Sequence, residues 1–215
     1  MILHIETATK ICSVALSKKG VLVDILEDDE QSYTHAENVT IFIQTLMQRN
    51  QVIWEDISAV AVTSGTGSYT GLRIGVSTAK GLCYGLGVPL IAVDALQSLA
   101  TQIQLLFPEK NYLPMIDARR MEVFSAIYDS NLEVLRPIQA DVLSADSYEE
   151  YQDLVIAGDG ITKLKEFWAH RENITWATAV KSSARGQVPI ATEKFKHKVF
   201  EDVAYFEPYY LKDFK

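Results

Sequence analysis

Cysteine and histidine are scarce in this chain. Its 215 residues include two cysteines, Cys12 and Cys83, and four histidines. Both cysteines lie among apolar residues and no CxxC pair occurs, so the sequence predicts buried free thiols rather than a disulfide framework. The HExxH motif is absent, and no two histidines lie close together in the sequence. We therefore expect no metal, no cofactor and no catalytic site built from these residue types.

Clustered positive charge and long apolar runs are missing as well. The chain has 20 Lys and Arg against 28 Asp and Glu, a net charge of -8, and its most basic stretch is KFKHK at 194–198. Such a surface repels a phosphate backbone, so we expect RNA to be reached only through a partner. No run of about 18 apolar residues predicts a membrane helix, and the opening MILHIETATK does not resemble a signal peptide. We expect a cytoplasmic protein without membrane contact.

The hydrophobic patterns follow an order that occurs twice along the chain. The segments ILHIE, ICSVALS and VLVDILE predict antiparallel strands, followed by a helix in which Val39, Ile43 and Leu46 recur at helical spacing. The strand ISAVAVTS, a helix over 71–86, the strand VPLIAV and a helix over 95–107 then predict parallel crossovers. After a break at Pro108, the strands YLPMIDA, EVFSAIY and DLVIAG, the helix DGITKLKEFWAH and a helix near 189–204 repeat this order more weakly.

This repetition predicts an α/β protein of two similar lobes, each a mixed sheet flanked by helices. We expect an N-terminal lobe over residues 1–103 and a C-terminal lobe over 104–189. The last segment, about 190–215, is expected to pack back on the N-terminal lobe.

The stretch SGTGSYTGLRIGV, residues 64–76, is unusually rich in glycine. Seven of the 11 glycines lie between Gly65 and Gly87. A strand, a glycine loop and a helix can hold phosphate, but the Walker pattern needs Lys and then Ser or Thr where this chain has Leu72 and Arg73. The spacing of Gly65, Gly67 and Gly71 is also one residue too long for the dinucleotide fingerprint. Close packing around the helix is the favoured interpretation, and nucleotide contact is the alternative.

These residues resemble a known family across much of the chain. The segment SGTGSYTGLRIGVSTAKGLCYGLGVPLIAVDALQSLA is similar to the glycine-rich segment of the TsaB (YeaZ) family. ILHIETATKICSVALS resembles the family's opening strands, HAENVTIFIQTL its first helix, and IDARRMEVFSAIY its Asp-Ala-Arg strand pair. EPYYLKDF is similar to the family's ending, with Lys212 in place of Arg. Residues 130–188 carry little recognisable signal.

The resemblance implies the two-lobed fold of the actin, Hsp70 and sugar-kinase superfamily, which is related to ribonuclease H. It also implies a role in making N6-threonylcarbamoyladenosine at position 37 of tRNA. In that machinery a sister protein, TsaD, carries the catalytic site and a metal, and this family is its non-catalytic paralogue. The implied partners are TsaD in a heterodimer, the ATPase TsaE in the same assembly, and a second copy of the chain when it is alone.

The residues that the superfamily uses for catalysis are largely replaced. The two metal-binding histidines of the sister family correspond to Ala95 and Leu99, and Glu6 stands where the superfamily usually has Asp. The first loop, ETATK, has no glycine, and no Gly-Gly pair occurs anywhere in the chain. We therefore expect no intrinsic activity. Contacts that a weakly bound nucleotide would use are assigned to Glu6, Thr7, Gly65, Gly67 and Ser68.

The glycine-rich helix is retained although the catalytic groups are not. Its apolar residues span more than one face, so one face serves the core while another can meet TsaD or a second copy. The expected interface residues are Leu72, Ile74, Gly75, Val76, Leu82, Cys83 and Leu86. Ile41 and Met47 of the preceding helix form a second candidate surface.

Two rival hypotheses stay open at this point. An independent small ATPase or kinase of the same superfamily is supported by the glycine loop and Asp117, although a strand-end salt bridge or turn is the more ordinary role for that residue. A metallopeptidase has weaker support because the sequence contains no recognisable metal motif.

Overall fold

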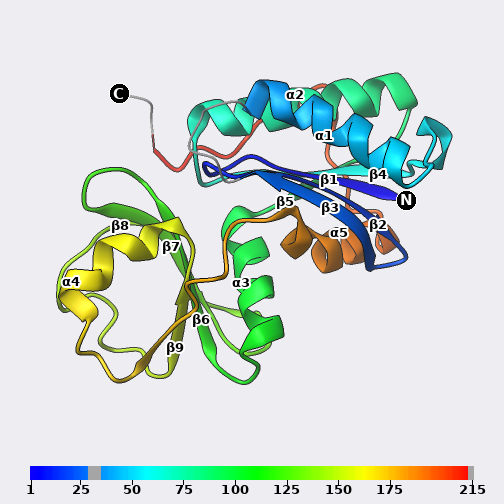
Figure 1. The fold of residues 1–215 in the computed structure, drawn as a ribbon. Coiled ribbons are helices and arrows are strands. Elements are labelled where there is room, and N and C mark those ends of the chain that lie inside the picture. Colours follow the sequence, from blue (N-terminus) through cyan, green and yellow to red (C-terminus); the bar gives the residue numbers. More distant parts are fainter. Residues whose placement is uncertain (29–34, 213–215) are drawn as a thin grey trace.

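The computed structural model describes residues 1–28 and 35–212. Its first sheet has the strand order β3-β2-β1-β4-β5 (Figure 1). Strands β1 (Ile2–Glu6), β2 (Cys12–Lys18) and β3 (Val21–Asp28) are antiparallel, whereas β4 (Ala59–Thr63) and β5 (Leu90–Val93) run parallel to β1. Two tight hairpins followed by two crossovers produce this mixed sheet, as the sequence predicts.

Helices cover both faces of the first sheet. Helices α1 (His35–Arg49) and α2 (Tyr69–Leu86) lie side by side on one face, and α5 (Gln187–Lys196) lies on the other (Figure 1). The two-residue alternation of β1 separates the two cores, because Leu3 and Ile5 pack toward α1 and α2 while Ile2 packs toward α5. A short helix, η1 (Trp54–Asp56), precedes β4.

The second sheet repeats the topology of the first. Its order is β10-β9-β6-β7-β8, with β6 (Asn111–Asp117), β7 (Glu122–Tyr128) and β8 (Val134–Val142) antiparallel, and β9 (Leu154–Ala157) and β10 (Ile174–Trp176) parallel to β6. The doubled scheme expected from the sequence is therefore confirmed. The single helix expected over DGITKLKEFWAH is instead a 3-10 helix, η2 (Asp159–Leu164), followed by one turn of α-helix, α4 (Lys165–Trp168).

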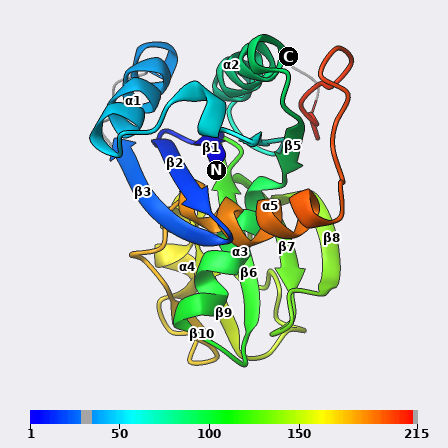
Figure 2. The ribbon, with the colours of Figure 1, turned by 90° about the vertical axis from the view of Figure 1, so that its right-hand side faces the viewer.

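In the middle of the molecule, each sheet packs against a helix that follows the other sheet in the chain (Figure 2). Helix α3 (Ala95–Leu106) follows β5 but packs on the second sheet, where Leu96, Leu99 and Ile103 join one apolar cluster with Tyr112 and other residues of the strands. The 3-10 helix η3 (Ala184–Gly186) leads the chain back into α5 on the first sheet. The lobe boundaries near residues 103 and 190 stay a prediction.

The helix expected near 189–204 is shorter than predicted. Helix α5 ends at Lys196, because Lys198 adopts a left-handed backbone with φ 55° and the Val199 N–H donates to the Lys194 carbonyl at 2.9 Å. This is a common way to end a helix. The described residues that follow, 197–212, form an extended C-terminal tail, which runs beside α2.

Candidate functional site

The glycine loop is packed against the first loop of the same chain. A Cβ atom on Gly67, whose φ is +148°, would lie 2.3 Å from the Ala8 carbonyl oxygen, and one on Gly71 would lie 2.1 Å from that of Thr7. The Ser68 N–H donates to the Ala8 carbonyl at 2.6 Å. Glycine is required here because backbone meets backbone, so the geometry supports the close-packing interpretation for this half of the loop.

The C-terminal tail closes the other side of the loop. The Tyr209 N–H donates to the Ser64 carbonyl at 2.6 Å, and a Cβ on Gly65 would lie 2.7 Å from the Tyr209 carbonyl oxygen. The Ser68 hydroxyl accepts from the Gly71 N–H at 3.2 Å and so caps α2. These backbone groups of the loop are therefore engaged within the chain.

Glu6 lies at the centre of a buried polar junction between β1, β4 and α5. Its carboxylate accepts from the Ala8 N–H at 2.7 Å and from the Thr63 hydroxyl at 2.6 Å. The Gln187 amide donates to the Thr63 hydroxyl and to the Ile5 carbonyl, both at 2.9 Å. Burial raises the pKa of the Glu6 carboxyl, and these hydrogen bonds oppose that rise. The neighbouring Thr7 hydroxyl is likewise occupied, since it donates to the Gly71 carbonyl at 2.8 Å.

The remaining residues of catalytic interest have structural partners. Ala95 and Leu99 are buried in the apolar cluster of α3. Asp117 accepts from the Lys163 ammonium and from the Arg119 N–H, each at 2.6 Å, so the strand end carries both an ion pair and a turn. Within residues 1–28 and 35–212, no group of three or more His, Cys, Asp or Glu is arranged to hold a metal.

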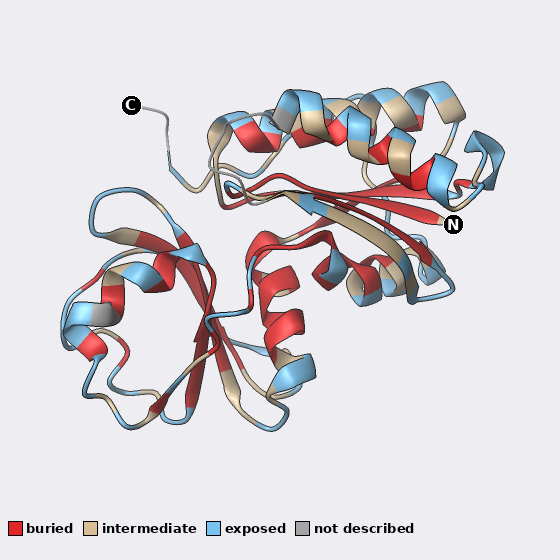
Figure 3. Ribbon diagram, in the orientation of Figure 1, coloured by how far each residue is buried: buried red, intermediate tan, exposed pale blue. Residues whose placement is uncertain are grey.

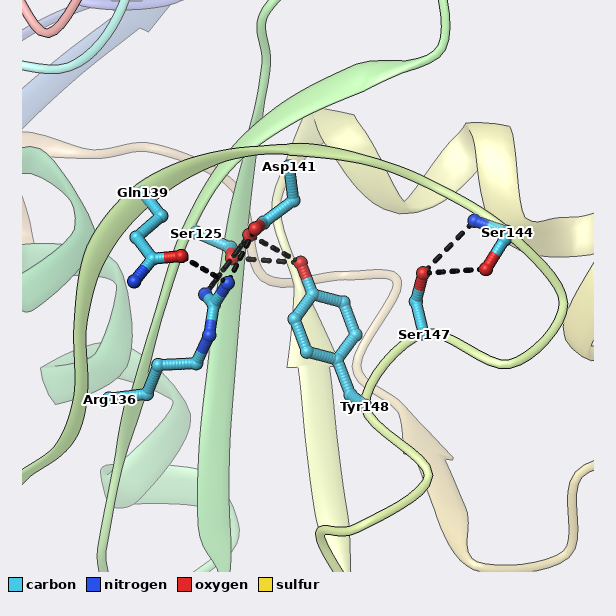
Figure 4. A network of polar contacts seen from close by, with 7 residues as sticks. All are labelled: Ser125, Arg136, Gln139, Asp141, Ser144, Ser147 and Tyr148. Atoms are coloured by element: carbon cyan, nitrogen blue, oxygen red, sulfur yellow. Dashed lines mark hydrogen bonds and ion pairs between the residues drawn. The ribbon is translucent and has the colours of Figure 1, made fainter.

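A half-buried polar network in the second lobe has no recognisable signal in the sequence (Figure 4). The Asp141 carboxylate accepts from Ser125 at 2.5 Å, from Tyr148 at 2.7 Å and from Arg136 at 2.5 and 3.0 Å. Burial acts to raise the pKa of Asp141, but these hydrogen bonds outweigh it and the pKa lies below its ordinary value. The members of this network bond mainly to one another. They lie on β7, on β8 and in the turn that follows, so their hydrogen bonds hold these three segments together.

The second half of α2 differs from the first. A Cβ on Gly81 or Gly85 would meet no atom within 4 Å, and the neighbouring Tyr84 is 87% exposed. Figure 3 shows that the buried residues of α1 and α2 face the sheet and that their exposed residues face outward. Glycine in a helix interior destabilises by about 0.5–1 kcal/mol relative to alanine. No atom among the described residues makes these two glycines necessary for the fold.

The structure places all seven expected interface residues of α2 in the core or half-buried against it. Four of them are buried inside the chain, namely Leu72, Gly75, Val76 and Cys83. Ile74, Leu82 and Leu86 are half-buried against the core of the first lobe. On α1, Ile41 is 53% exposed, whereas Met47 is 6% exposed and belongs to the core, so its place in the second candidate surface was wrong.

The chain is similar in sequence to known proteins along most of its length. A family model described as TsaD, tRNA N6-adenosine threonylcarbamoyltransferase, matches residues 29–214. The chain is 35% identical to TsaB of Escherichia coli over 59% of its own length and 54% of that protein, and 30% identical to TsaB of Bacillus subtilis over 69% and 64%. Both relatives are described as tRNA threonylcarbamoyladenosine biosynthesis proteins. The chain spans about half the length of the Escherichia coli relative.

A solved structure of YeaZ from Pseudomonas aeruginosa shares the fold, with a TM-score of 0.81, 24% identity and coverage of 98% of this chain and 99% of that chain. The duplicated mixed sheet defines the class of protein, which is a two-lobed α/β protein with two mixed sheets of the same topology. Within that class, the chain belongs to the TsaB/YeaZ family. No helix in the described part of the chain is long and apolar enough to cross a membrane.

Proposed function

We propose that this protein is a non-catalytic subunit of the machinery that forms N6-threonylcarbamoyladenosine at position 37 of tRNA. It binds the catalytic paralogue TsaD through the outward face of α1 and α2 and holds that partner in an active conformation. The tRNA is reached through the partner, in keeping with the net charge of -8 on this chain. The assembly works in the cytoplasm, and TsaE is a further member of it. Without TsaD, the same face pairs with a second copy.

The observation that carries this proposal is the uncovered pair Gly81 and Gly85. Their Cβ positions are open, whereas Gly71 of the same helix is covered by the Thr7 backbone and Gly75 by the Thr7 side chain. One turn separates the two open glycines, so a partner helix can approach the α2 backbone closely along this line. Tyr84 of the same helix and Ile41 of the neighbouring helix α1 are exposed as well. A stable complex would bury roughly 800 Å² on each partner.

The test measures association of the purified chain with the catalytic paralogue by titration calorimetry. Gly81→Gln and Gly85→Gln place side chains into the expected contact without disturbing the core, so each should weaken binding by about tenfold or more. Charged substitutions at Ile74 or Leu82 are less suitable, because both side chains pack against the core of the first lobe.

Ala169→Gln is the matched control, since Ala169 is exposed and lies just after α4 in the second lobe. It adds a side chain of the same size and should leave the affinity unchanged. Unaltered binding by both glycine variants would place the interface elsewhere. Absence of binding by the unsubstituted chain would overturn the proposed function itself.

The rival hypothesis of an independent ATPase is tested on the isolated chain. Titration with ATP and magnesium should give no turnover, because Glu6 is held by Thr63 and Ala8 in a buried junction. Strong binding together with steady hydrolysis would favour the rival enzyme. Membership in the complex is tested separately, by asking whether addition of the chain stimulates tRNA modification by the paralogue.

A further inference from the structure

Helix α2 carries a positively charged stripe in a negatively charged protein. Arg73, Ser77, Lys80 and Tyr84 follow one another at spacings of four, three and four residues, so they share one face of the helix. Arg73, Ser77 and Tyr84 are exposed and Lys80 is half-exposed. Helix α2 contains no Asp or Glu among its 18 residues, although acidic residues outnumber basic ones in the chain, 28 to 20.

Arg73 is held in place by aromatic rings. Its guanidinium carbon lies 4.0 Å from the centroid of the Tyr69 ring and 6.0 Å from that of Tyr210. Its Nε donates to the Tyr210 hydroxyl at 3.3 Å. Stacking of this kind fixes the guanidinium plane while its terminal nitrogens remain able to donate to a carboxylate.

Lys80 is held in place by the C-terminal tail. Its ammonium donates to the carbonyls of Ala204 at 3.1 Å and Phe206 at 3.0 Å. The third of its three N–H groups can therefore still donate to a partner. Among the described residues, neither Lys80 nor Arg73 forms an ion pair with a carboxylate within 4.0 Å. Within the described part of the chain, neither cation is therefore neutralised by a carboxylate at ion-pair distance, although the hydrogen bond to Tyr210 and, more weakly, the charge of Glu207 raise the pKa of Arg73.

A hollow lies between this stripe and the tail. Its volume is about 280 Å³, and it is lined by Arg73, Val76, Ser77, Lys80, Phe206, Glu207, Pro208 and Tyr210. The cations are seven residues apart, which corresponds to about 10 Å along a helix axis. A partner helix running along α2 would match them with acidic side chains at positions i and i+7.

We propose that Arg73 and Lys80 receive two carboxylates of the catalytic paralogue, carried about two turns apart on the helix that packs over Gly81 and Gly85. The proposal rests on the function proposed above and adds the chemistry of the partner surface. A protein partner is favoured over RNA because the stripe offers only two cations on a chain of net charge -8, whereas a nucleic acid carries a negative charge at every nucleotide. Fixed Arg and exposed Tyr side chains are also typical anchors of protein interfaces.

The experiment measures the affinity of the full chain for the catalytic paralogue at about 50 mM and about 200 mM salt, a range over which exposed charges become screened. Arg73→Glu and Lys80→Glu should each weaken binding by about tenfold or more at low salt and reduce its salt dependence. Ser77→Glu should have the same effect while leaving both cations and their contacts with the tail in place. Thermal unfolding of each variant confirms that it is folded.

Lys196→Glu is the matched control, because it makes the same charge change on α5, at the opposite face of the first sheet. It should leave affinity for the paralogue unchanged. Normal binding by all three stripe variants overturns this inference and leaves the proposed function intact. Loss of tRNA affinity with unchanged affinity for the paralogue also overturns it and assigns the stripe to nucleic acid. If the unsubstituted chain does not bind the paralogue, the proposed function fails first.

Discussion

Glycine-to-alanine substitutions along α2 should have opposite effects at its two ends. At Gly71 the new methyl group would lie 2.1 Å from the Thr7 carbonyl oxygen, so the backbone of one segment must move. Overpacking of this kind destabilises the folded state by about 1–3 kcal/mol, and the higher helix propensity of alanine offsets about 0.5–1 kcal/mol of this loss. Gly71→Ala should therefore lower the free energy of unfolding, by up to about 2.5 kcal/mol.

At Gly81 the methyl group meets no atom within 4 Å. Only the helix preference then acts, so Gly81→Ala should raise the free energy of unfolding by about 0.5–1 kcal/mol. For a chain of this size, each kcal/mol corresponds to about 2–4 °C in Tm. The two variants should therefore lie on opposite sides of the unsubstituted protein.

The assay is urea and thermal unfolding of the isolated chain, followed by circular dichroism. Protein concentration is kept low and varied, because self-association through this face would stabilise the folded chain. A fall in stability for Gly81→Ala equal to that for Gly71→Ala would refute the view that one end of α2 is packed and the other open. Gly85→Ala repeats the measurement at a second open position.

Three further predictions concern buried groups and the tail. Burial lowers the pKa of His4 from 6.5 to about 3, so between these pH values the unfolded chain binds a proton that the folded chain does not. The free energy of unfolding should therefore fall by about 1.4 kcal/mol for each pH unit below 6.5. Urea titrations at several pH values should show that His4→Gln removes this dependence on pH. Gly65→Val should displace Tyr209, because a Cβ there would lie 2.7 Å from the Tyr209 carbonyl oxygen, and limited proteolysis should then cut the tail sooner than in the unsubstituted protein. Asp141→Ala should destabilise by about 1–3 kcal/mol, since it leaves the half-buried guanidinium of Arg136 without its carboxylate, and an equally stable variant in urea would contradict this role.

Much of the fold could be predicted from the sequence because it depends on local pattern. The short apolar run ILHIE predicts a buried strand, and the helical spacing of Val39, Ile43 and Leu46 places these residues on the face that meets the core. The order of strands and helices, occurring twice, then predicts two mixed sheets of the same topology. The candidate helix α2 and the glycine loop could be located for the same reason.

Local pattern is less informative where the structure depends on contacts between distant segments. The end of α5 at Lys196 and the Asp141 network both involve conformations or partners that no local pattern specifies. The surface of α1 was misjudged at Met47 for a related reason, since helical spacing does not reveal how wide the buried face is.

Along α2, hydrophobic spacing is enough to predict a helix, and the residue order places an unusual number of glycines in it. The packing of distant segments is what puts Thr7 and Ala8 over one end of this segment and leaves the Cβ positions of Gly81 and Gly85 open. A glycine has no side chain, so its presence in the sequence is equally compatible with a backbone pressed against it and with empty space. Which of the two applies depends on where the rest of the chain folds.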